Sequence, residues 1–365
     1  KQVKVTITGD TVQERAETLK LVLSEVKGAT IADGTGRGTI VNDDAAGADA
    51  PKVSISDANV TEGTAATGWL STEGNQIIDA AGHAVQIAGV NWFGFEGTNM
   101  NPNGLWTRSY QDMMKQMLDE GFNTIRLPFS SDMLHSTATP GGIDYGKNPD
   151  LKGLTSLQIM DKIVAYAEEI GIKIILDHHR SSAGNGTSEN GLWYDGAHSQ
   201  ASWVDDWQML AERYADNTAV IGADLHNEPY NGTWGGGGAN DWALAAETAG
   251  NAIGAGNPNW LIFVEGVATY KGQNYWWGGN LMGVKDRPID LTLDNKLVYS
   301  AHDYPATVYN QSWFSDPDYP NNLTEVFDKA WGYIYREGIA PVYLGEFGTK
   351  LTETKDVQWL DAITA

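Results

Sequence analysis

The segment SLQIMDKIVAYAEEIGIKIILD, residues 156–177, decides the fold of this 365-residue chain. Its first part, Ser156–Ile170, repeats apolar side chains at the spacing of an amphipathic helix. After a glycine, Lys173–Asp177 is a short apolar run that ends on an acidic residue, as expected of a buried strand. A helix that leads directly into a buried strand is the repeating unit of α/β proteins with a parallel sheet.

The same unit recurs along the chain from residue 69 onward. Seven segments have the length and composition of buried strands: Val85–Trp92, Thr124–Pro128, Lys173–Asp177, Val220–His226, Trp260–Glu265, Leu297–Ala301 and Pro341–Gly345. Five amphipathic helices are predicted between them: Ser109–Glu120, Ser156–Ile170, Ser202–Asp216, Asp241–Ile253 and Leu323–Glu337. This series predicts an α/β fold, a (β/α)8 TIM barrel that lacks its last β/α unit in this chain. A doubly wound sheet is the alternative, but no glycine-rich phosphate loop follows the first strand.

The N-terminal residues have a different pattern. Residues 1–50 alternate apolar and polar side chains between glycine-rich turns, which predicts half-buried β-strands. The segment ATIADGTGRGTIVNDD, residues 29–44, resembles the last strands of a Calx-β domain, an immunoglobulin-like sandwich. We therefore expect a partial all-β segment over 1–50, a linker with the start of a second such repeat over 51–68, and the barrel over 69–365.

Composition excludes several classes of function. The chain carries 47 acidic and 24 basic residues, a formal net charge of −23, which disfavours nucleic acid and anionic membranes as partners. No apolar run is long enough to cross a bilayer. Cysteine is absent, which excludes thiolate metal sites and cysteine nucleophiles. Strong acidity without cysteine fits an exported protein that is kept soluble by charge, but an acidic cytosolic enzyme would have a similar composition. We expect a secreted monomer, although no signal peptide opens the chain at Lys1.

Two glutamates at strand ends are candidates for catalysis. Polar side chains at the carboxyl ends of barrel strands converge on one mouth, and Glu228 follows the fourth predicted strand while Glu346 follows the seventh. These strands lie across the ring from each other, so a sugar can lie between the two carboxyls. Cleavage with retention needs carboxyls about 5–5.5 Å apart, one protonated and one ionised. Arg126 in the second strand would keep Glu346 anionic, while burial and nearby negative charge would raise the pKa of Glu228.

Five motifs, in order, resemble those of glycoside hydrolase family 5. They are NTIRLPF at 123–129, IILDHHR at 174–180, LHNEPYNGTW at 225–234, YSAHDYP at 299–305 and YLGEFGT at 343–349. GVNWFGFE at 89–96 and YWWGGNLMGV at 275–284 further resemble the bacterial endo-β-1,4-glucanases, or cellulases, of that family. The resemblance implies a retaining, endo-acting hydrolase that cuts β-1,4-glucosidic bonds in cellulose or related β-glucans by double displacement, without a cofactor. It implies Glu228 as acid/base and Glu346 as nucleophile.

The resemblance also implies supporting roles for the residues that match these motifs. Asn227 would bond the sugar 2-hydroxyl, and His179 would bond the neighbouring hydroxyl. Arg126 and Tyr304 would orient and stabilise the nucleophile, and His302 would line the site beside the acid/base.

Tryptophans are candidates for the sugar-binding cleft. Sugar rings present flat C–H faces that pack on indoles, and the chain has 14 tryptophans, many of which will belong to the core. Five of them lie in or after predicted strands at the mouth: Trp92, Trp193, Trp234, Trp276 and Trp277. Trp193 and Trp277 lie in glycine-rich loops and are the leading candidates for sugar contacts.

Other polar residues near the strand ends are interpreted as structural. Alternation along a strand sends His178 away from the side that His179 faces. Asp177 and Glu265 are interpreted as hydrogen-bonded scaffolding, and Glu96 as structural or a contact at the rim.

One metal site has to be weighed in the N-terminal segment. Asp43 and Asp44 end the Calx-β-like stretch and could bind calcium. A solvated turn is the favoured interpretation, so no metal site is expected.

Three alternative functions remain open. The same barrel could serve as a β-mannanase or a xyloglucanase. A noncatalytic carbohydrate-binding or adhesive protein would result if the missing barrel unit disables catalysis. A barrel metallohydrolase is disfavoured because two adjacent histidines point in opposite directions; its ligands would be His178, His179, His302 and Asp303.

Overall fold

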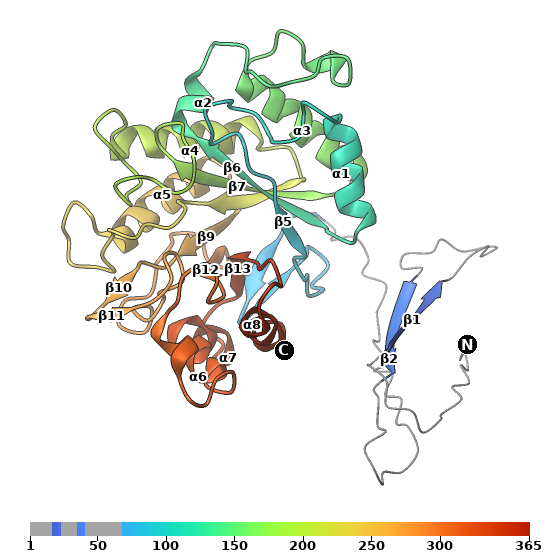
Figure 1. Ribbon diagram of the computed structural model, residues 1–365. Coiled ribbons are helices and arrows are strands. Elements are labelled where there is room, and N and C mark those ends of the chain that lie inside the picture. The colour runs from blue at the N-terminus through green and yellow to red at the C-terminus, as the bar shows by residue number, and fades with distance from the viewer. Residues whose placement is uncertain (1–16, 23–34, 41–67) are drawn as a thin grey trace. The chain divides into compact units, whose positions relative to one another are not determined.

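The chain divides into two compact units, Lys1–Thr64 and Ala65–Ala365. The computed structural model describes residues 17–22, 35–40 and 68–365 (Figure 1). In the first unit, β1 (Glu17–Val22) pairs antiparallel with β2 (Thr35–Ile40). Both strands lie where the sequence predicts β-structure, and the Calx-β-like topology stays a prediction.

Two of the sequence-based interpretations fall on other parts of the N-terminal segment. Asp43 and Asp44, the calcium candidates, lie outside the described residues, as does the predicted linker over 51–68 apart from its last residue.

The second unit is built around a parallel sheet with the strand order β13-β12-β9-β8-β7-β6-β5. Its strands are β5 (Gly89–Asn91), β6 (Thr124–Ser130), β7 (Lys173–Arg180), β8 (Val220–Asp224), β9 (Leu261–Glu265), β12 (Leu297–Asp303) and β13 (Val342–Phe347). All seven predicted strands are therefore confirmed. Every residue of β6, β8 and β9 is buried. β8 and β9 are accordingly apolar up to their last, acidic residue, whereas β6 alternates Ile125, Leu127 and Phe129 with inward positions that include Arg126.

The sheet curls into a near-closed barrel (Figure 1). Its two end strands, β5 and β13, are joined through a side chain, because Asn91 Nδ2 donates a hydrogen bond to Gly345 O at 3.0 Å. Their inner sides also approach closely, since the Tyr343 hydroxyl lies where a Cβ on Gly89 would stand. The seven described strands thus enclose a common interior.

Helices lie outside the sheet, with α1 to α5 beside β5 to β9 and α6 to α8 beside β12 and β13 (Figure 1). They are α1 (Tyr110–Asp119), α2 (Ser131–His135), α3 (Ser156–Ile170), α4 (Gln200–Arg213), α5 (Trp242–Gly256), α6 (Leu323–Phe327), α7 (Tyr333–Arg336) and α8 (Thr354–Ile363). Short 3-10 turns are η1 (Pro149–Leu151) and η2 (Ser312–Ser315), and a π-helical turn is η3 (Asp328–Gly332).

The boundaries of α3 are those that the sequence predicts, for local reasons. Thr155 forms a capping box with Gln158, and Gly171 ends the helix with a left-handed backbone, φ 81°. The predicted helix over 323–337 is instead interrupted, because the π-helical turn η3 separates α6 from α7.

Two short hairpins were not predicted, because each strand is only two or three residues long. They are β3 (Ser71–Glu73) with β4 (Gln76–Ile78), and β10 (Thr269–Tyr270) with β11 (Gln273–Asn274). Leu70 and Ile77 of the first hairpin region share an apolar cluster with Ile175, Phe263 and Val298 from three barrel strands. The hairpin therefore closes the apolar end of the barrel interior.

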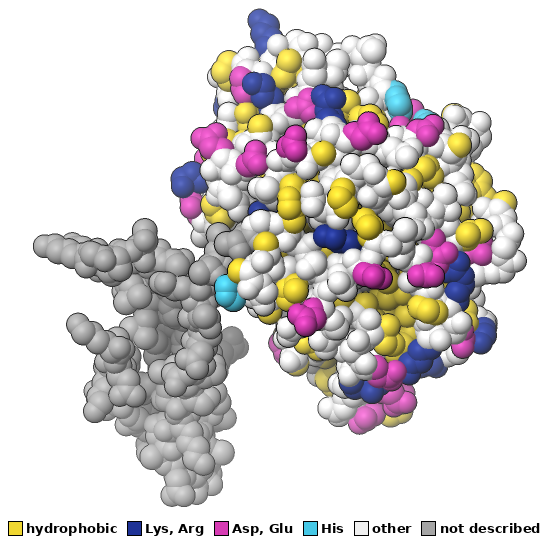
Figure 2. Space-filling view, turned by 180° about the vertical axis from the view of Figure 1, so that it is seen from behind, with side chains coloured by type: hydrophobic (Ala, Val, Ile, Leu, Met, Phe, Trp, Pro, Cys, Tyr) yellow, Lys and Arg dark blue, Asp and Glu magenta, His cyan; other side chains and the backbone are white. Residues whose placement is uncertain are grey.

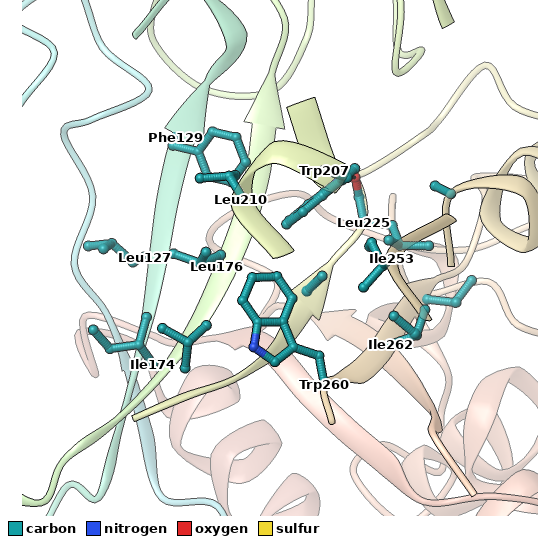
Figure 3. Packing of buried hydrophobic residues seen from close by; sticks show 14 of the residues in the cluster. Leu127, Phe129, Ile174, Leu176, Trp207, Leu210, Leu225, Ile253, Trp260 and Ile262 are labelled. Carbon is teal, nitrogen blue, oxygen red and sulfur yellow. Dashed lines mark hydrogen bonds between the residues drawn. The ribbon is translucent and has the colours of Figure 1, made fainter. Parts of the chain in front are cut away.

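The main core lies between the sheet and its helices. Figure 3 shows Leu127 and Phe129 of β6 and Leu176 of β7 beside Trp207 and Leu210 of α4. All five side chains are at most 1% exposed. Alternation along the strands therefore turns apolar side chains outward to the helices and leaves the inward positions near the carboxyl ends for polar groups.

The outer surface carries charges of both signs. Figure 2 shows acidic side chains spread over one face of the second unit, with lysines and arginines among them. Among the described residues, no helix has the length and apolarity that a membrane span requires.

Candidate active site

Arg126 lies at the centre of a buried polar network inside the barrel. Its side chain is fully buried on β6, where Nε donates to Asp224 Oδ2 at 2.8 Å and Nη2 donates to Glu265 Oε1 at 3.0 Å. Nη1 donates to Glu346 Oε1 at 2.9 Å and lies 3.1 Å from Asp177 Oδ2. Burial opposes the positive charge, but the surrounding carboxylates hold the pKa of Arg126 well above its ordinary value. The guanidinium therefore stays a cation, and it pairs with one carboxyl group from each of four strands.

Glu346, on β13, is held in its ionised form. Burial alone would raise its pKa, but the charges of His302, Arg126 and His179 lower it to about 2. The Tyr304 hydroxyl adds to this by donating to Glu346 Oε2 at 2.6 Å. A carboxylate fixed at both oxygens by an arginine and a tyrosine is suited to attack an electrophilic carbon.

Glu228 has the opposite environment. Burial raises its pKa, His302 opposes the rise, and the negative charges of Glu346 and Glu265 add to it. Its Oε1 lies 3.1 Å from His302 Nδ1, and its backbone N–H donates to Glu265 Oε2 at 2.8 Å. Glu228 has φ 49°, a left-handed backbone that costs a non-glycine residue roughly 1–2 kcal/mol. The chain therefore holds a carboxyl with elevated proton affinity in a strained turn just after β8.

The two glutamates lie close together. One oxygen of Glu228, one oxygen of Glu346 and a nitrogen of His302 all lie within 4.8 Å of one another. Carboxyls of retaining glycosidases are about 5–5.5 Å apart, and those of inverting enzymes about 6.5–9.5 Å. The separation, together with pKa shifts of opposite sign, fits one proton donor and one nucleophile at the same sugar.

His179 and Asn227 flank this pair as the sequence predicts. His179 Nδ1 lies 2.7 Å from Asp177 Oδ2. Burial lowers the pKa of His179, but the Asp177 carboxylate outweighs burial, and the pKa rises to about 9. Asn227 Oδ1 accepts a hydrogen bond from Arg126 Nη2 at 3.2 Å, which fixes the orientation of the amide. Of the residues interpreted as structural, Asp177 and Glu265 do serve as scaffolding, and Glu96 is buried with Oε2 accepting from Gly94 N–H at 2.6 Å.

The structure corrects part of the tryptophan prediction. Trp193 is wrong as a sugar contact, because it is 0% exposed, its Nε1 donates to Gln200, and it packs on Trp203 and Trp242. Its loop folds back over the core, a path that the glycines around it do not determine.

Three other predicted tryptophans offer little open surface. Trp92, Trp234 and Trp276 are 4–7% exposed. The indole N–H groups of Trp92 and Trp234 donate to backbone carbonyls, and Trp276 packs edge-on against Tyr304.

Trp277, by contrast, has open surface. It is 46% exposed and stacks on Tyr230 with ring centroids 4.1 Å apart. Sequence reasoning missed a second exposed tryptophan, Trp106, which is 51% exposed in the loop after β5. Its position in a long loop after a barrel strand was the available signal.

Two partners of Arg126 were also missed. Asp224 ends β8, and Asn91 Oδ1 at the end of β5 accepts from Arg126 Nη1 at 3.2 Å. Their places at strand ends could have indicated both residues.

Two groups of described side chains have the composition of metal ligands, and both are otherwise engaged. Asp177, Asp224 and Glu265 surround the guanidinium of Arg126, which occupies the place of a cation. The other group is Glu228, His302 and Glu346, in which the imidazole lies 3.1 Å from Glu228 and 3.8 Å from Glu346.

The metallohydrolase constellation is not assembled. His178 lies 2.8 Å from His226, on the opposite side of β7 from His179, and Asp303 accepts from Tyr275 and Trp359.

Replacement of Arg126 tests the network that holds the site. Arg126→Met should lower the free energy of unfolding by about 3–5 kcal/mol, because it leaves buried carboxylates without their cation. Urea unfolding followed by circular dichroism measures the loss. Arg213→Met is the matched control, since Arg213 pairs with Asp161 at a half-exposed site and should cost about 1 kcal/mol or less. Equal losses in the two variants would contradict a central role for Arg126.

Comparison with known proteins identifies the family. The family described as Cellulase (glycosyl hydrolase family 5) matches residues 78–365. An endoglucanase from Paenibacillus polymyxa is 50% identical over 303 residues, which cover 81% of this chain and 76% of that protein. The major extracellular endoglucanase of Xanthomonas campestris pv. campestris is 42% identical over 296 residues, 79% of this chain and 60% of that protein.

Solved structures agree with these relatives. The catalytic domain of the Xanthomonas campestris endoglucanase superposes with a TM-score of 0.76 at 40% identity, covering 81% of this chain and 86% of that one. An endocellulase from Pyrococcus horikoshii, solved in complex with cellotetraose, has a TM-score of 0.75 at 41% identity with the same coverage. The fold, the paired glutamates and these similarities lead to one conclusion: the chain belongs to the cellulases of glycosyl hydrolase family 5.

Proposed function

We propose that the chain is a retaining endo-β-1,4-glucanase with Glu346 as nucleophile and Glu228 as acid/base. The observation that carries the proposal is the short separation of these two carboxyls, within 4.8 Å, with the pKa of one lowered and that of the other raised. Endoglucanase relatives at 50% and 42% identity support the same activity.

The geometry supplies each step of double displacement. Glu346 attacks the anomeric carbon while Glu228 protonates the leaving glycosidic oxygen, and a glycosyl ester forms on Glu346. Glu228, now ionised, takes a proton from a water molecule, which displaces the sugar from Glu346. His302 lies 3.1 Å from the acid/base, and Glu265 and Glu346 raise the pKa of its imidazole well above its ordinary value although burial opposes the rise, which favours the protonated ring. It balances the charge that moves between the two glutamates.

Several side chains near this pair are candidates for sugar contacts. Asn227 and His179 are the candidates for the 2-hydroxyl and its neighbour, and both are oriented by buried charged partners. Trp277 and Trp106 are exposed and come from loops that follow different strands, so they are the candidates for stacking on further sugar units. Contacts with several consecutive sugar units of one glucan chain favour cleavage inside the polymer over cleavage at its end.

The preferred polymer is proposed to be β-1,4-glucan. The support is the endoglucanase identity of the relatives and the cellotetraose complex of a structural neighbour. Action outside the cell is supported by the Xanthomonas relative, which is named a major extracellular endoglucanase. A monomeric state remains a prediction.

Product stereochemistry tests the mechanism. Proton NMR of cellotetraose hydrolysis should show the β-anomer first, with the α-anomer appearing only by mutarotation. Release of reducing ends from carboxymethylcellulose with a rapid fall in viscosity should accompany it. Initial formation of the α-anomer would contradict retention, and turnover of mannan or xyloglucan but not of cellulose derivatives would contradict the substrate.

Tyr304 should set the acid limit of activity. Its hydroxyl stabilises the ionised form of Glu346, so Tyr304→Phe should raise the pKa of Glu346 from about 2 toward its ordinary value. Since Glu346 must be ionised to attack, the acid limb of kcat/KM should move to higher pH, by about one to two pH units. Profiles from pH 2 to pH 7 measure the shift.

Tyr299→Phe is the matched control for this profile. Tyr299 lies on β12, the strand that ends just before Tyr304, but points outward, where its hydroxyl accepts from Ile289 N–H. An acid limb that moves equally in both variants would contradict the specific role of Tyr304.

A further inference from the structure

A pair of buried histidines lies behind the active site, on the outer side of the barrel wall. His178 Nδ1 and His226 Nδ1 are 2.8 Å apart, and both side chains are 0% exposed. His178 Nε2 lies 3.1 Å from Ser131 Oγ, while His226 Nε2 has no hydrogen-bond partner among the described residues. The mechanism proposed above uses neither ring.

Each histidine directly precedes a residue placed at the sugar. His178 is followed by His179, and His226 is followed by Asn227. Because side chains alternate across a strand, an outward ring at one position fixes the inward direction of the next side chain. The pair therefore joins the outer sides of the two segments whose inner sides carry the predicted hydroxyl contacts.

The pair lies just beyond the end of the β7–β8 ladder. The last paired residues of β7 and β8 are Asp177 and Asp224, and although β6 pairs with β7 as far as Arg180, the segment after β8 needs other interactions to keep its register against β7. A single backbone bond continues the connection, from Asn227 N–H to His178 O at 3.0 Å. The contact between the His178 and His226 rings links the same two segments through their side chains. Together the two contacts hold the residues after β8, which lead to Glu228, against the end of β7.

Both rings are neutral. Burial lowers the pKa of His178 well below its ordinary value, and the charges of His226, His179 and His198 lower it further. Burial lowers the pKa of His226 to about 3, although Asp177 opposes the shift. A bond between two Nδ1 atoms then requires one ring to carry its proton at Nδ1 and the other ring to leave Nδ1 bare. The contact is therefore a directional hydrogen bond between two complementary tautomers.

We propose that His178 and His226 are positioning residues: their mutual hydrogen bond holds the ends of β7 and β8 in the register that places His179 and Asn227 at the sugar. The inference rests on the proposed function, because it assigns those two residues to substrate. It goes beyond that function because neither histidine touches substrate or the catalytic glutamates.

Two nearly isosteric substitutions separate the hydrogen bond from simple packing. His226→Asn keeps a polar atom near the position of Nδ1, whereas His226→Leu removes it. His226→Leu should lower kcat on cellotetraose by about 10²-fold with little change in KM, the size expected when catalytic groups are misplaced by about 1 Å. His226→Asn should stay within about threefold of the parent. The loss should not add to that of Asn227→Ala in the double variant, because both changes disable the same contact.

Asn257→Leu is the control for a merely structural effect. Asn257 is 1% exposed, and its Nδ2 donates to Ala211 O at 3.1 Å at the end of α5. This variant should lower the melting temperature but leave kcat unchanged. A folded His226→Leu protein with parental kcat, or equal kcat losses in His226→Leu and Asn257→Leu, would overturn the proposal.

A readout that does not depend on turnover separates this inference from the proposed function. The side-chain amide signals of Asn227 in ¹⁵N–¹H NMR spectra should shift in His226→Leu and remain in place in His226→Asn and Asn257→Leu. Unshifted Asn227 signals in His226→Leu would overturn the positioning role even if the parent hydrolyses cellotetraose. A parent without activity on any β-glucan would instead contradict the proposed function, while the NMR result would still decide whether the pair positions Asn227.

Discussion

Glu346→Ala is expected to lower kcat on carboxymethylcellulose by about 10⁴-fold or more, because no covalent intermediate can form without the nucleophile. The fold should survive, since Arg126 keeps its contacts with Asp177, Asp224 and Glu265. Reducing-end assays and circular dichroism on the same preparation measure both quantities.

A small anion should restore turnover in this variant. Azide can enter the volume left by the carboxylate and attack the anomeric carbon from the same side, so the product should be the α-glycosyl azide. Glu337→Ala is the control, because Glu337 is an exposed carboxylate on the outer surface and its removal should leave kcat unchanged. Substantial activity of Glu346→Ala without azide would remove Glu346 from the nucleophile role.

Glu228→Ala should produce a loss that depends on the leaving group. For cellotetraose the expected fall in kcat is about 10²–10⁴-fold, because the glycosidic oxygen must be protonated as it leaves. For 2,4-dinitrophenyl β-cellobioside the first step needs no acid, so the glycosyl ester on Glu346 should form in a burst and then accumulate. Stopped-flow release of dinitrophenol measures the burst.

The second half of the reaction distinguishes the two glutamates. Azide should accelerate turnover of the dinitrophenyl substrate by Glu228→Ala and give the β-glycosyl azide, the opposite configuration from that expected with Glu346→Ala. Equal losses for both substrates, or the α-product from Glu228→Ala, would contradict the acid/base assignment.

Much of the fold could be predicted because it depends on local patterns. Buried parallel strands are short apolar runs, and the helices between them have a clear apolar face, so the strand predicted at Lys173–Asp177 and the helix predicted at Ser156–Ile170 are evident from the pattern, although the strand continues to Arg180. The hairpins of two or three residues and the π-helical turn at 328–332 are too short to have a periodicity of their own.

The site could be predicted only to the extent that single residues reveal it. Glu228 and Glu346 are indicated by their places after strands, and alternation indicates that His178 points away from the site. The partners of these residues depend on tertiary structure: Arg126 meets Asp224 across 98 positions of sequence, and His178 meets His226 across 48. Whether an indole is open to a sugar depends on the path of its loop, which is why the prediction for Trp193 was wrong and the exposed Trp106 was not singled out.

The left-handed backbone of Glu228 has a consequence for engineering. A glycine at position 228 would adopt this backbone conformation without strain. Stability therefore favours glycine there, whereas the proposed acid/base chemistry requires glutamate. Variant libraries selected for thermal stability alone would therefore be enriched in inactive substitutions of Glu228. Directed evolution of a more durable enzyme from this scaffold therefore has to screen turnover in the same round as survival.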